Sequence, residues 1–415
     1  MAIVKPFRGF RPVKELVDRI ASRPYDVLNS DEAREEAKDN PHTFLHVVKP
    51  EIDLPEDIDH YDNAVYEKGK ENLNKLIEKK IFFQEKSESY YIYAQSMWGK
   101  TQFGLVGCAS VEDYLNNIIK KHELTRPVKE EDRKNHIRTT NFNAEPVFFA
   151  YPDNKGINEI VSRIIKADPV YNFKTPDGVG HTLWIIDSEE DIKEIERIFR
   201  KEIKYTYVAD GHHRTAAAAH VGEERKRQNP QHTGDEEYNY FLAVHFPASQ
   251  LTIIDYNRVV KDLNGLSEKD FIDKVAHHFD IITESAEILK PSIVHEFSMY
   301  LSKKWYLLKA KPGTYDDSDP IECLDVTVLS KYILEPLLDI KDLRNSDRID
   351  FVGGIRGLEE LVKRVDSGEI KVAFALYPVS MEQLMRIADT DNIMPPKTTW
   401  FEPKLRSGLV IHDLE

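Results

Sequence analysis

Short apolar runs and stretches of helical apolar spacing alternate along the whole chain, which predicts a mixed α/β (α+β) fold. In the stretch 62–80, for example, Val65, Leu73 and Leu76 recur at the spacing that places them on one helix face. Helices are predicted over 12–22, 31–38 with Ser30 as cap, 62–80, 129–140, 158–167, 189–201, 215–220, 268–279, 328–333 and 357–365. Strands are predicted over 44–48, 89–95, 102–108, 146–151, 183–186, 203–208, 238–245, 251–256, 305–309 and 372–376.

The length of 415 residues exceeds what one hydrophobic core usually serves, so two or three domains are expected. We predict an N-terminal mixed α/β segment over 1–115, a core over 116–262 that carries most of the candidate chemistry, and a C-terminal α/β domain over 263–415. The charged stretch 223–237, which contains Pro230 and Gly234, is predicted to be a surface loop.

The run Val208–Thr215 holds the most specific candidate site. It follows an apolar strand candidate and opens an alanine-rich helix, so Asp210-Gly211-His212-His213-Arg214 marks a junction of strand, turn and helix. Such a junction suits phosphate, because the first N–H groups of a helix lack intrahelical partners and the helix dipole adds positive charge there. Gly211 allows a tight turn, and Arg214 supplies donors that match phosphate oxygens. The alternative is a simple turn in which Asp210 caps the helix.

Composition narrows the class of protein. The net charge of −15 argues against general binding to the nucleic-acid backbone, although one local positive pocket would suffice for a nucleotide. No apolar run reaches the roughly 20 residues that a bilayer span needs, so no membrane partner is expected. The N-terminus lacks the apolar segment of a secretory signal. Because Cys108 and Cys323 are the only cysteines, we expect a reducing cytoplasm and neither a disulfide scaffold nor a cysteine-based zinc site.

A second polar group precedes the phosphate-type turn. His122-Glu123, with Thr125 and Arg126, leads into a very polar helix that contains Arg133. A carboxylate near a phosphate site can accept a hydroxyl proton or hold a metal ion. The alternative for these residues is a solvated loop and a solvent-facing helix start.

Three further motifs are less specific. The stretch 394–401 contains two prolines and either holds Lys397 and Thr398 in a pocket or forms a rigid surface loop. The run 94–101 fits a relaxed Walker A pattern, but the residues after it lack helical composition, so a β-hairpin turn is expected. The glycine turn within 351–358 is typical of α/β packing, although it could hold an anion.

The run Asp210–Arg214 resembles the phosphate-binding motif of the ParB/sulfiredoxin superfamily, and within it the Asp-Gly-His-His-Arg stretch of the free L-serine kinases. The order of strand 118–121, His122-Glu123, helix, Pro146-led strand and nucleotide turn is also similar to theirs. This match covers about 116–262. Nearly the whole chain resembles a microbial family known as a domain of unknown function. The supporting stretches are 24–27, 122–126, 209–214 and 394–399.

The resemblance implies a ParB/sulfiredoxin-like core that transfers phosphate from ATP or ADP to free L-serine or a similar hydroxy-amino acid. Glu123 would act as the base, with Asp210 and His213 as further catalytic residues, and Asp210 or Glu123 would hold Mg²⁺. The expected nucleotide-binding residues are Gly211, His212, His213, Arg214 and Thr215. The expected substrate-binding residues are His122, Thr125, Arg126, Arg133, Lys397 and Thr398. The alternative is a nucleotide-binding regulator of the ParB-like type without kinase turnover.

Overall fold

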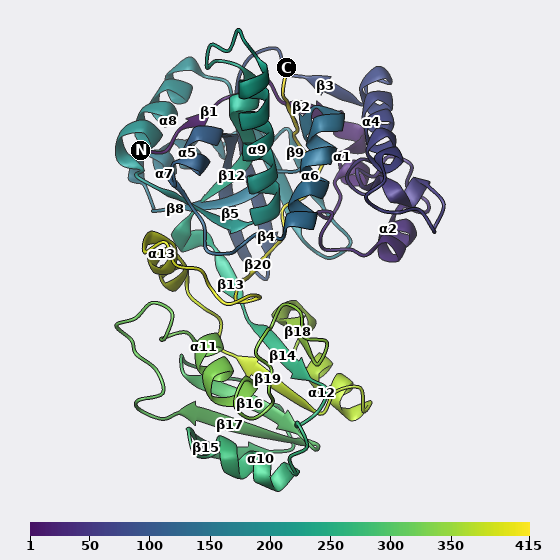
Figure 1. Ribbon diagram of the computed structural model, residues 1–415. Helices are drawn as coiled ribbons and strands as arrows, with labels where there is room; N and C mark the ends of the chain where they lie inside the picture. Colours follow the sequence, from purple (N-terminus) through teal and green to yellow (C-terminus); the bar gives the residue numbers. More distant parts are fainter. The chain divides into compact units, whose positions relative to one another are not determined.

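The computed structural model describes residues 1–415, which form two compact units. The first unit contains Met1–Leu251 together with Pro403–Glu415, and the second contains Thr252–Glu402. The sequence predicted three segments. Strands from the predicted segments 1–115 and 116–262 share one sheet in the first unit, as Figure 1 shows.

The first unit is mixed α/β, as predicted. Its helices are η1 (Lys14–Leu16), α1 (Val17–Ile20), α2 (Ser30–Ala37), α3 (Leu45–Val48), η2 (Pro50–Asp53), α4 (Asn63–Glu78), α5 (Val111–Leu115), α6 (Pro127–Thr140), α7 (Lys155–Ile164), α8 (Glu189–Glu202), α9 (His212–Gln228), η3 (Glu237–Asn239) and η4 (Ala248–Gln250). Its strands are β1 (Val4–Lys5), β2 (Phe10–Pro12), β3 (Phe82–Gln84), β4 (Tyr90–Met97), β5 (Lys100–Ser110), β6 (Ile119–Lys120), β7 (Phe142–Asn143), β8 (Val147–Tyr151), β9 (Tyr171–Lys174), β10 (Gly180–Ile186), β11 (Thr206–Asp210), β12 (Tyr240–Pro247) and β21 (His412–Asp413).

The main sheet has nine strands in the order β6-β11-β8-β12-β5-β4-β10-β9, and β1 also pairs with β5. Strands β6 and β11 run parallel, with Thr206 opposite Ile119 and Tyr207 opposite Lys120. The segments that follow these two strands therefore leave the sheet at the same edge. This arrangement brings His122-Glu123 to the phosphate-type turn.

Helices are held on this sheet by buried apolar clusters. Alanines of α9, such as Ala217, pack with Val208 and Phe241 of the sheet, and Ile137 of α6 joins the same cluster. Small side chains let α9 approach the sheet closely, because they leave little volume between the backbones. The start of α9 is thereby fixed at the end of β11.

Some sequence predictions for the first unit need correction. Residues 44–48 were expected to form a strand, but Leu45–Val48 is helical, because one helical turn buries Leu45, Val47 and Val48 together in the N-terminal core. Helix α9 extends to Gln228 into the predicted loop, and Asn29 instead of Ser30 caps α2. The hairpin expected at 94–101 is confirmed: Met97 pairs with Lys100 around a turn.

The second unit is an antiparallel sheet with helices. Its elements are β13 (Thr252–Ile254), β14 (Tyr256–Val260), α10 (Glu268–Val275), β15 (Phe279–Ser285), β16 (Glu296–Leu301), β17 (Lys304–Ala310), α11 (Asp325–Leu329), η5 (Ser330–Leu334), β18 (Ile349–Gly353), η6 (Gly354–Arg356), α12 (Glu359–Asp366), β19 (Val372–Leu376), α13 (Met381–Asp389) and β20 (Trp400–Glu402). Six strands pair in the order β15-β17-β16-β19-β14-β18. Leu361 of α12 is buried against Val259 and Trp305 of this sheet. None of the helices in either unit combines the length and apolar character needed to span a bilayer.

Candidate functional site

The turn after β11 has the geometry of an open helix N-terminus. Strand β11 ends at Asp210 with a β-bulge, and α9 begins at His212. Gly211 between them adopts the left-handed conformation with φ 92°, which favours glycine. No side chain caps the helix. The first amides of α9 and the positive end of its dipole are therefore open to an anion.

Replacing Gly211 with alanine is expected to destabilise the protein by about 1–3 kcal/mol and to weaken anion binding at this turn. An alanine here takes on left-handed strain, and its Cβ would lie 3.2 Å from the Arg214 guanidinium. Gly99 offers a matched control, because its φ is 76° but nothing lies within 4 Å of the corresponding Cβ. Urea unfolding and nucleotide titration of both variants measure the effects. Equal losses of nucleotide affinity in the two variants would contradict the prediction.

Asp210 is held between two cations. Its Oδ1 lies 2.9 Å from Lys404 Nζ, and its Oδ2 accepts a hydrogen bond of 3.1 Å from Arg214. Burial by itself would raise the pKa of the Asp210 carboxyl, but the charges of Lys404 and Arg214 outweigh it and lower the pKa to about 2. Asp210 is thus ionised at neutral pH, and both of its oxygens are engaged by protein groups.

The Arg214 guanidinium points back into the protein. It is buried and donates to the carbonyl oxygen of Pro146 at 2.8 Å as well as to Asp210. Burial disfavours its charge, but Asp26, Glu145 and Asp210 overcome this and raise its pKa. Arg214 therefore ties the helix start to the strands and contributes fixed positive charge beneath the turn.

Two histidine rings stand edge-to-face beside the turn. The ring centroids of His122 and His212 are 4.4 Å apart, and both side chains are buried. Burial lowers the pKa of His122 to about 3 and that of His212 to about 4, so both imidazoles are neutral at pH 7. His122 also has a hydrogen bond to the backbone of Val208. The pair supplies hydrogen-bonding groups without adding positive charge.

Glu123 lies at the helix start. Its Oε2 is 3.8 Å from Nδ1 of His212, and the Glu123 side chain is 38% exposed, whereas His212 is buried. The carboxylate thus stands at the boundary between the buried histidines and solvent, next to the uncapped amides of α9. The residues that the sequence predicted as base and as anion cradle are brought together here.

His213 fastens the His122–Arg126 segment to α9. Its Nε2 accepts a hydrogen bond of 2.9 Å from the backbone N–H of Arg126, so in the neutral ring the proton resides on Nδ1. Burial lowers the pKa of His213. Arg126 has an exposed side chain close to the turn, whereas the Thr125 hydroxyl donates a hydrogen bond to the Glu130 carboxylate. Thr215 likewise donates to the carbonyl oxygen of Gly211.

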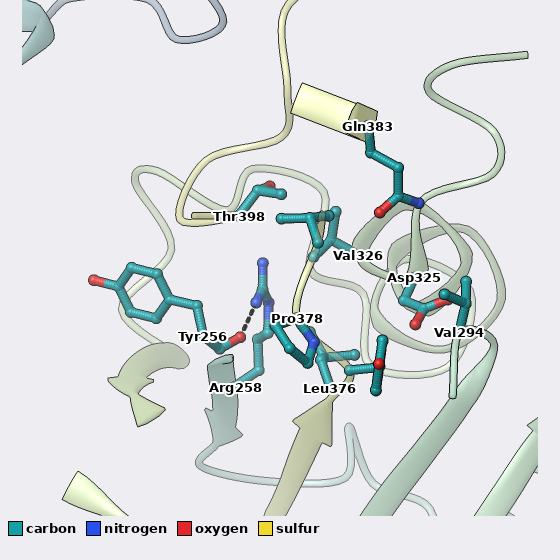
Figure 2. A pocket seen from close by; sticks show the side chains of 11 residues that line it. Tyr256, Arg258, Val294, Asp325, Val326, Leu376, Pro378, Gln383 and Thr398 are labelled. Atoms are coloured by element: carbon teal, nitrogen blue, oxygen red, sulfur yellow. Dashed lines mark hydrogen bonds between the residues drawn. The ribbon is translucent and has the colours of Figure 1, made fainter. Parts of the chain in front are cut away.

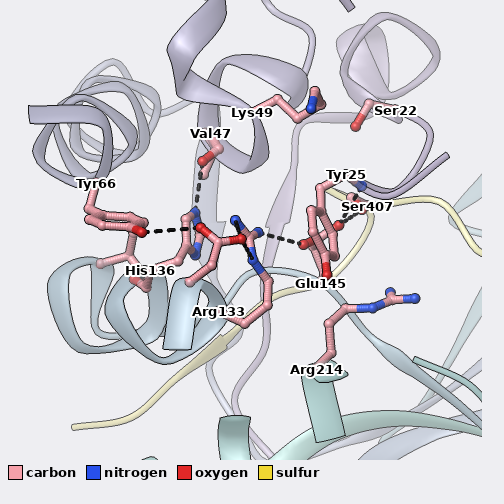
Figure 3. Close-up of polar contacts among 12 residues, drawn as sticks. Ser22, Tyr25, Val47, Lys49, Tyr66, Arg133, His136, Glu145, Arg214 and Ser407 are labelled. Atoms are coloured by element: carbon pink, nitrogen blue, oxygen red, sulfur yellow. Dashed lines mark hydrogen bonds and ion pairs between the residues drawn. The ribbon is translucent and has the colours of Figure 1, made fainter. Parts of the chain in front are cut away.

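Arg133 lies in a buried polar cluster that Figure 3 shows together with Arg214. Its guanidinium hydrogen-bonds Asp132, contacts Glu145 at 3.5 Å, and stacks on the ring of Tyr25 at 3.9 Å. Glu145 also accepts from the backbone N–H of Tyr25 and from the hydroxyl of Ser407. The cluster joins the N-terminal segment and the C-terminal segment to the base of the site.

Lys397 and Thr398 belong to the second unit. Lys397 lies over the ring of Tyr256, with Nζ 5.7 Å from its centroid, and Thr398 is buried and donates to the carbonyl oxygen of Pro395. Their predicted contact with the substrate of the first unit stays a prediction.

Four residues around the turn were not predicted from the sequence as site residues. Lys404 pairs with Asp210 across 194 residues, and nothing near it in the sequence marks it. Glu145 directly precedes Pro146, just before β8, and belongs to no recognised motif. Tyr25 and Asp26 lie in the stretch 24–27, which supports the family resemblance but does not indicate a role for either residue. The negative charge of Asp26 helps to raise the pKa of Arg214.

The structure contains no group of three or more His, Cys, Asp or Glu side chains arranged to hold a metal ion. Magnesium sites commonly use one or two carboxylates and complete their shell with phosphate oxygens and water. Of the two carboxylates predicted as Mg²⁺ ligands, Glu123 has the more accessible oxygens, because Asp210 is engaged by Lys404 and Arg214.

Comparison with known proteins places the chain in a family. Among solved structures, "Free serine kinase in complex with AMP" aligns with 79% of this chain and 93% of its own, at 12% identity and a TM-score of 0.36. A conserved hypothetical protein from Pyrococcus furiosus (74% and 95%, 14% identity, TM-score 0.34) and SbnI with C-terminal truncation from Staphylococcus aureus (74% and 87%, 11% identity, TM-score 0.36) align similarly. The curated proteins give no significant match. Residues 4–327 match the family described as "Protein of unknown function (DUF1015)", and the chain therefore belongs to this family.

Proposed function

We propose that this protein is a nucleotide-dependent phosphotransferase that moves a phosphoryl group from ATP or ADP to the hydroxyl of free L-serine or a similar hydroxy-amino acid. The observation that carries the proposal is the position of Glu123, whose carboxylate stands 3.8 Å from His212 at the uncapped start of α9. A proton acceptor and an anion cradle at one place are two of the parts that phosphoryl transfer to a hydroxyl uses.

The residues of the turn would divide the work as follows. The first amides of α9 would hold the terminal phosphate oxygens, with the positive helix end and the buried Arg214 charge behind them. The proton on Nδ1 of His213 and the neutral His212 could hydrogen-bond the phosphoryl group. The exposed Arg126 guanidinium would bind the carboxylate of the amino acid.

In the reaction, the serine Oγ attacks the terminal phosphorus of the nucleotide and forms the new P–O bond. The bond from that phosphorus to the bridging oxygen breaks, so ADP leaves from ATP, or AMP from ADP. The proton of the serine hydroxyl passes to the Glu123 carboxylate. Mg²⁺, when bound, would neutralise phosphate charge, with Glu123 as its candidate protein ligand.

One observation favours the alternative, a nucleotide-binding regulator without turnover. Arg214 and Lys404 both form ion pairs with the Asp210 carboxylate, so neither side chain extends into the open turn. Kinases usually place a cation directly on the transferring phosphoryl group. A regulator would need only the amide cradle, and Glu123 would then serve no chemical purpose.

The full-length protein should form phosphoserine when incubated with L-serine, Mg²⁺ and either ATP or ADP. Phosphorus NMR would follow the phosphoserine signal together with the ADP or AMP released. A folded protein that binds nucleotide, as shown by titration calorimetry, but forms no phosphorylated amino acid with either nucleotide would support the regulator instead. Absence of nucleotide binding would overturn both.

A further inference from the structure

The second unit encloses a small pocket at the end of β14 (Figure 2). Arg258 of β14 and Asp325 of α11 are its charged residues, and Thr398 and Gln383 contribute polar groups. Aliphatic side chains, including Leu376, form much of the remaining wall. The pocket lies wholly within Thr252–Glu402 and involves none of the residues around Glu123.

Arg258 is a buried cation without a carboxylate partner. Its side chain is 1% exposed, and its guanidinium donates to the carbonyl oxygens of Tyr256 and, at 3.5 Å, of Pro396. Burial without a counter-charge lowers the pKa of Arg258 to about 9. A guanidinium offers five N–H donors in one plane, and two carbonyl partners use only part of them. Its charge has an aromatic neighbour, because the guanidinium carbon lies 5.4 Å from the ring centroid of Phe351, but it faces no carboxylate.

The carboxylate in the same pocket is already matched. Asp325 accepts hydrogen bonds from the backbone N–H of His295 and pairs with its Nδ1 at 2.9 Å. The partner of Asp325 is therefore His295, not Arg258. Lys397, which lies over the ring of Tyr256, adds a second positive charge beside the pocket. The net charge around Arg258 is thus positive, which favours an anion.

We propose that this pocket binds the carboxylate group of a small organic acid, with the Arg258 guanidinium as its main partner. The enclosed volume is about 10 Å³, which holds one oxygen-sized group. A carboxylate can insert one of its oxygens there. Gln383 lines the same pocket, and its Oε1 accepts a hydrogen bond from the backbone N–H of Ser380. The apolar walls strengthen the charge-assisted hydrogen bond by excluding water.

The test is a titration of the full-length protein with ¹³C-labelled acetate, followed by line broadening of the acetate signal. We expect saturable binding of acetate that unlabelled formate displaces. Displacement by L-serine would show that the site accepts the carboxylate of an amino acid, and failure of serine to displace acetate would restrict it to acids without an α-ammonium group. Displacement by phosphate alone, or non-saturable broadening, would overturn the proposal.

Three variants test whether acetate binds at Arg258. Arg258→Gln should weaken acetate binding by about tenfold or more, because a charged hydrogen bond is lost. Gln383→Glu keeps the shape and the bond to Ser380 but places a negative charge in the pocket, so it should abolish acetate binding even if Arg258→Gln fails to fold. Arg386→Gln is the matched control, because Arg386 is exposed and donates to Asp317 and Ser318. Unchanged binding in Gln383→Glu would overturn the assignment.

This inference is independent of the phosphotransferase proposal. Glu123→Gln should leave acetate binding unchanged, since Glu123 belongs to the first unit. Loss of acetate binding in that variant would place the acetate site in the first unit and overturn the assignment to Arg258.

Discussion

Replacing Glu123 with glutamine is expected to lower the rate of phosphoserine formation by a factor of about 10²–10⁴ while nucleotide affinity changes little. Glutamine has the same shape and can still reach His212, but it cannot accept the proton of the attacking hydroxyl. The amides at the start of α9 remain unaltered, so the phosphate cradle is kept. The two quantities therefore separate the role of base from the role of binding residue.

The measurement pairs phosphorus NMR of the turnover with calorimetric titration of ADP, on wild type and variant. Glu159→Gln on α7 is the control, because this exposed glutamate pairs only with the exposed Lys155. It should keep the wild-type rate. If Glu123→Gln retained full turnover, Glu123 would not be the base. If it lost nucleotide affinity in proportion to rate, it would act in binding, most directly as a ligand of Mg²⁺.

Below about pH 6.5 the protein is expected to lose stability steeply. Five buried histidines have pKa values lowered mainly by burial, to about 3 for three of them and to about 4 for the other two, against 6.5 for a histidine in the unfolded chain. These residues are His122, His181 and His245, followed by His136 and His212. The unfolded chain therefore binds more protons than the folded protein between these values. Each histidine lowers the free energy of unfolding by about 1.4 kcal/mol per pH unit in this window.

The combined slope is on the order of several kcal/mol per pH unit, comparable with the 5–15 kcal/mol that stabilises a typical domain. Asp113 opposes one histidine, because burial raises the pKa of its carboxyl to about 6, so the folded protein gains stability there as the pH falls. Burial also raises the pKa of Glu145, Asp325 and Asp413, which act in the same direction. The five histidines, joined by His213 with its lowered pKa, outnumber these carboxyls. We therefore expect cooperative acid unfolding near pH 5, well above the range in which ordinary carboxylates titrate.

His245 allows a direct test. Both of its ring nitrogens are buried without a hydrogen-bond partner, and it packs against Phe149 and Phe199. His245→Phe should lose no hydrogen bond, and relative to wild type it should gain about 2 kcal/mol of stability between pH 8 and pH 5. Urea unfolding at both pH values measures this difference. The exposed His60→Phe is the control and should show none. An equal pH dependence in His245→Phe and wild type would refute the assignment.

The sequence predicted most elements of the first unit because their signals are local. Alanine-rich and amphipathic spacing indicated α9 and α8, and short apolar runs indicated β8 and β12. It failed at 44–48, where β-branched residues favour a strand but long-range burial of Leu45, Val47 and Val48 stabilises a helical turn. Burial in a tertiary core outweighs a propensity that differs by less than about 1 kcal/mol per residue.

In the candidate site, too, some features follow from the local sequence and others only from the tertiary structure. The sequence alone determined the open turn, because Gly211 permits the left-handed conformation and the helix that follows leaves its first amides without partners. Only the tertiary structure decided how the neighbouring charges are used. Parallel pairing of β6 with β11 brings Glu123 to the turn. The C-terminal segment 403–415 returns to the first unit and brings Lys404 to Asp210. The sequence predicted Arg214 as a phosphate ligand and Arg133 as a substrate ligand, but buried carboxylates draw both guanidinium groups inward. A guanidinium removed from water must find its counter-charge inside the protein.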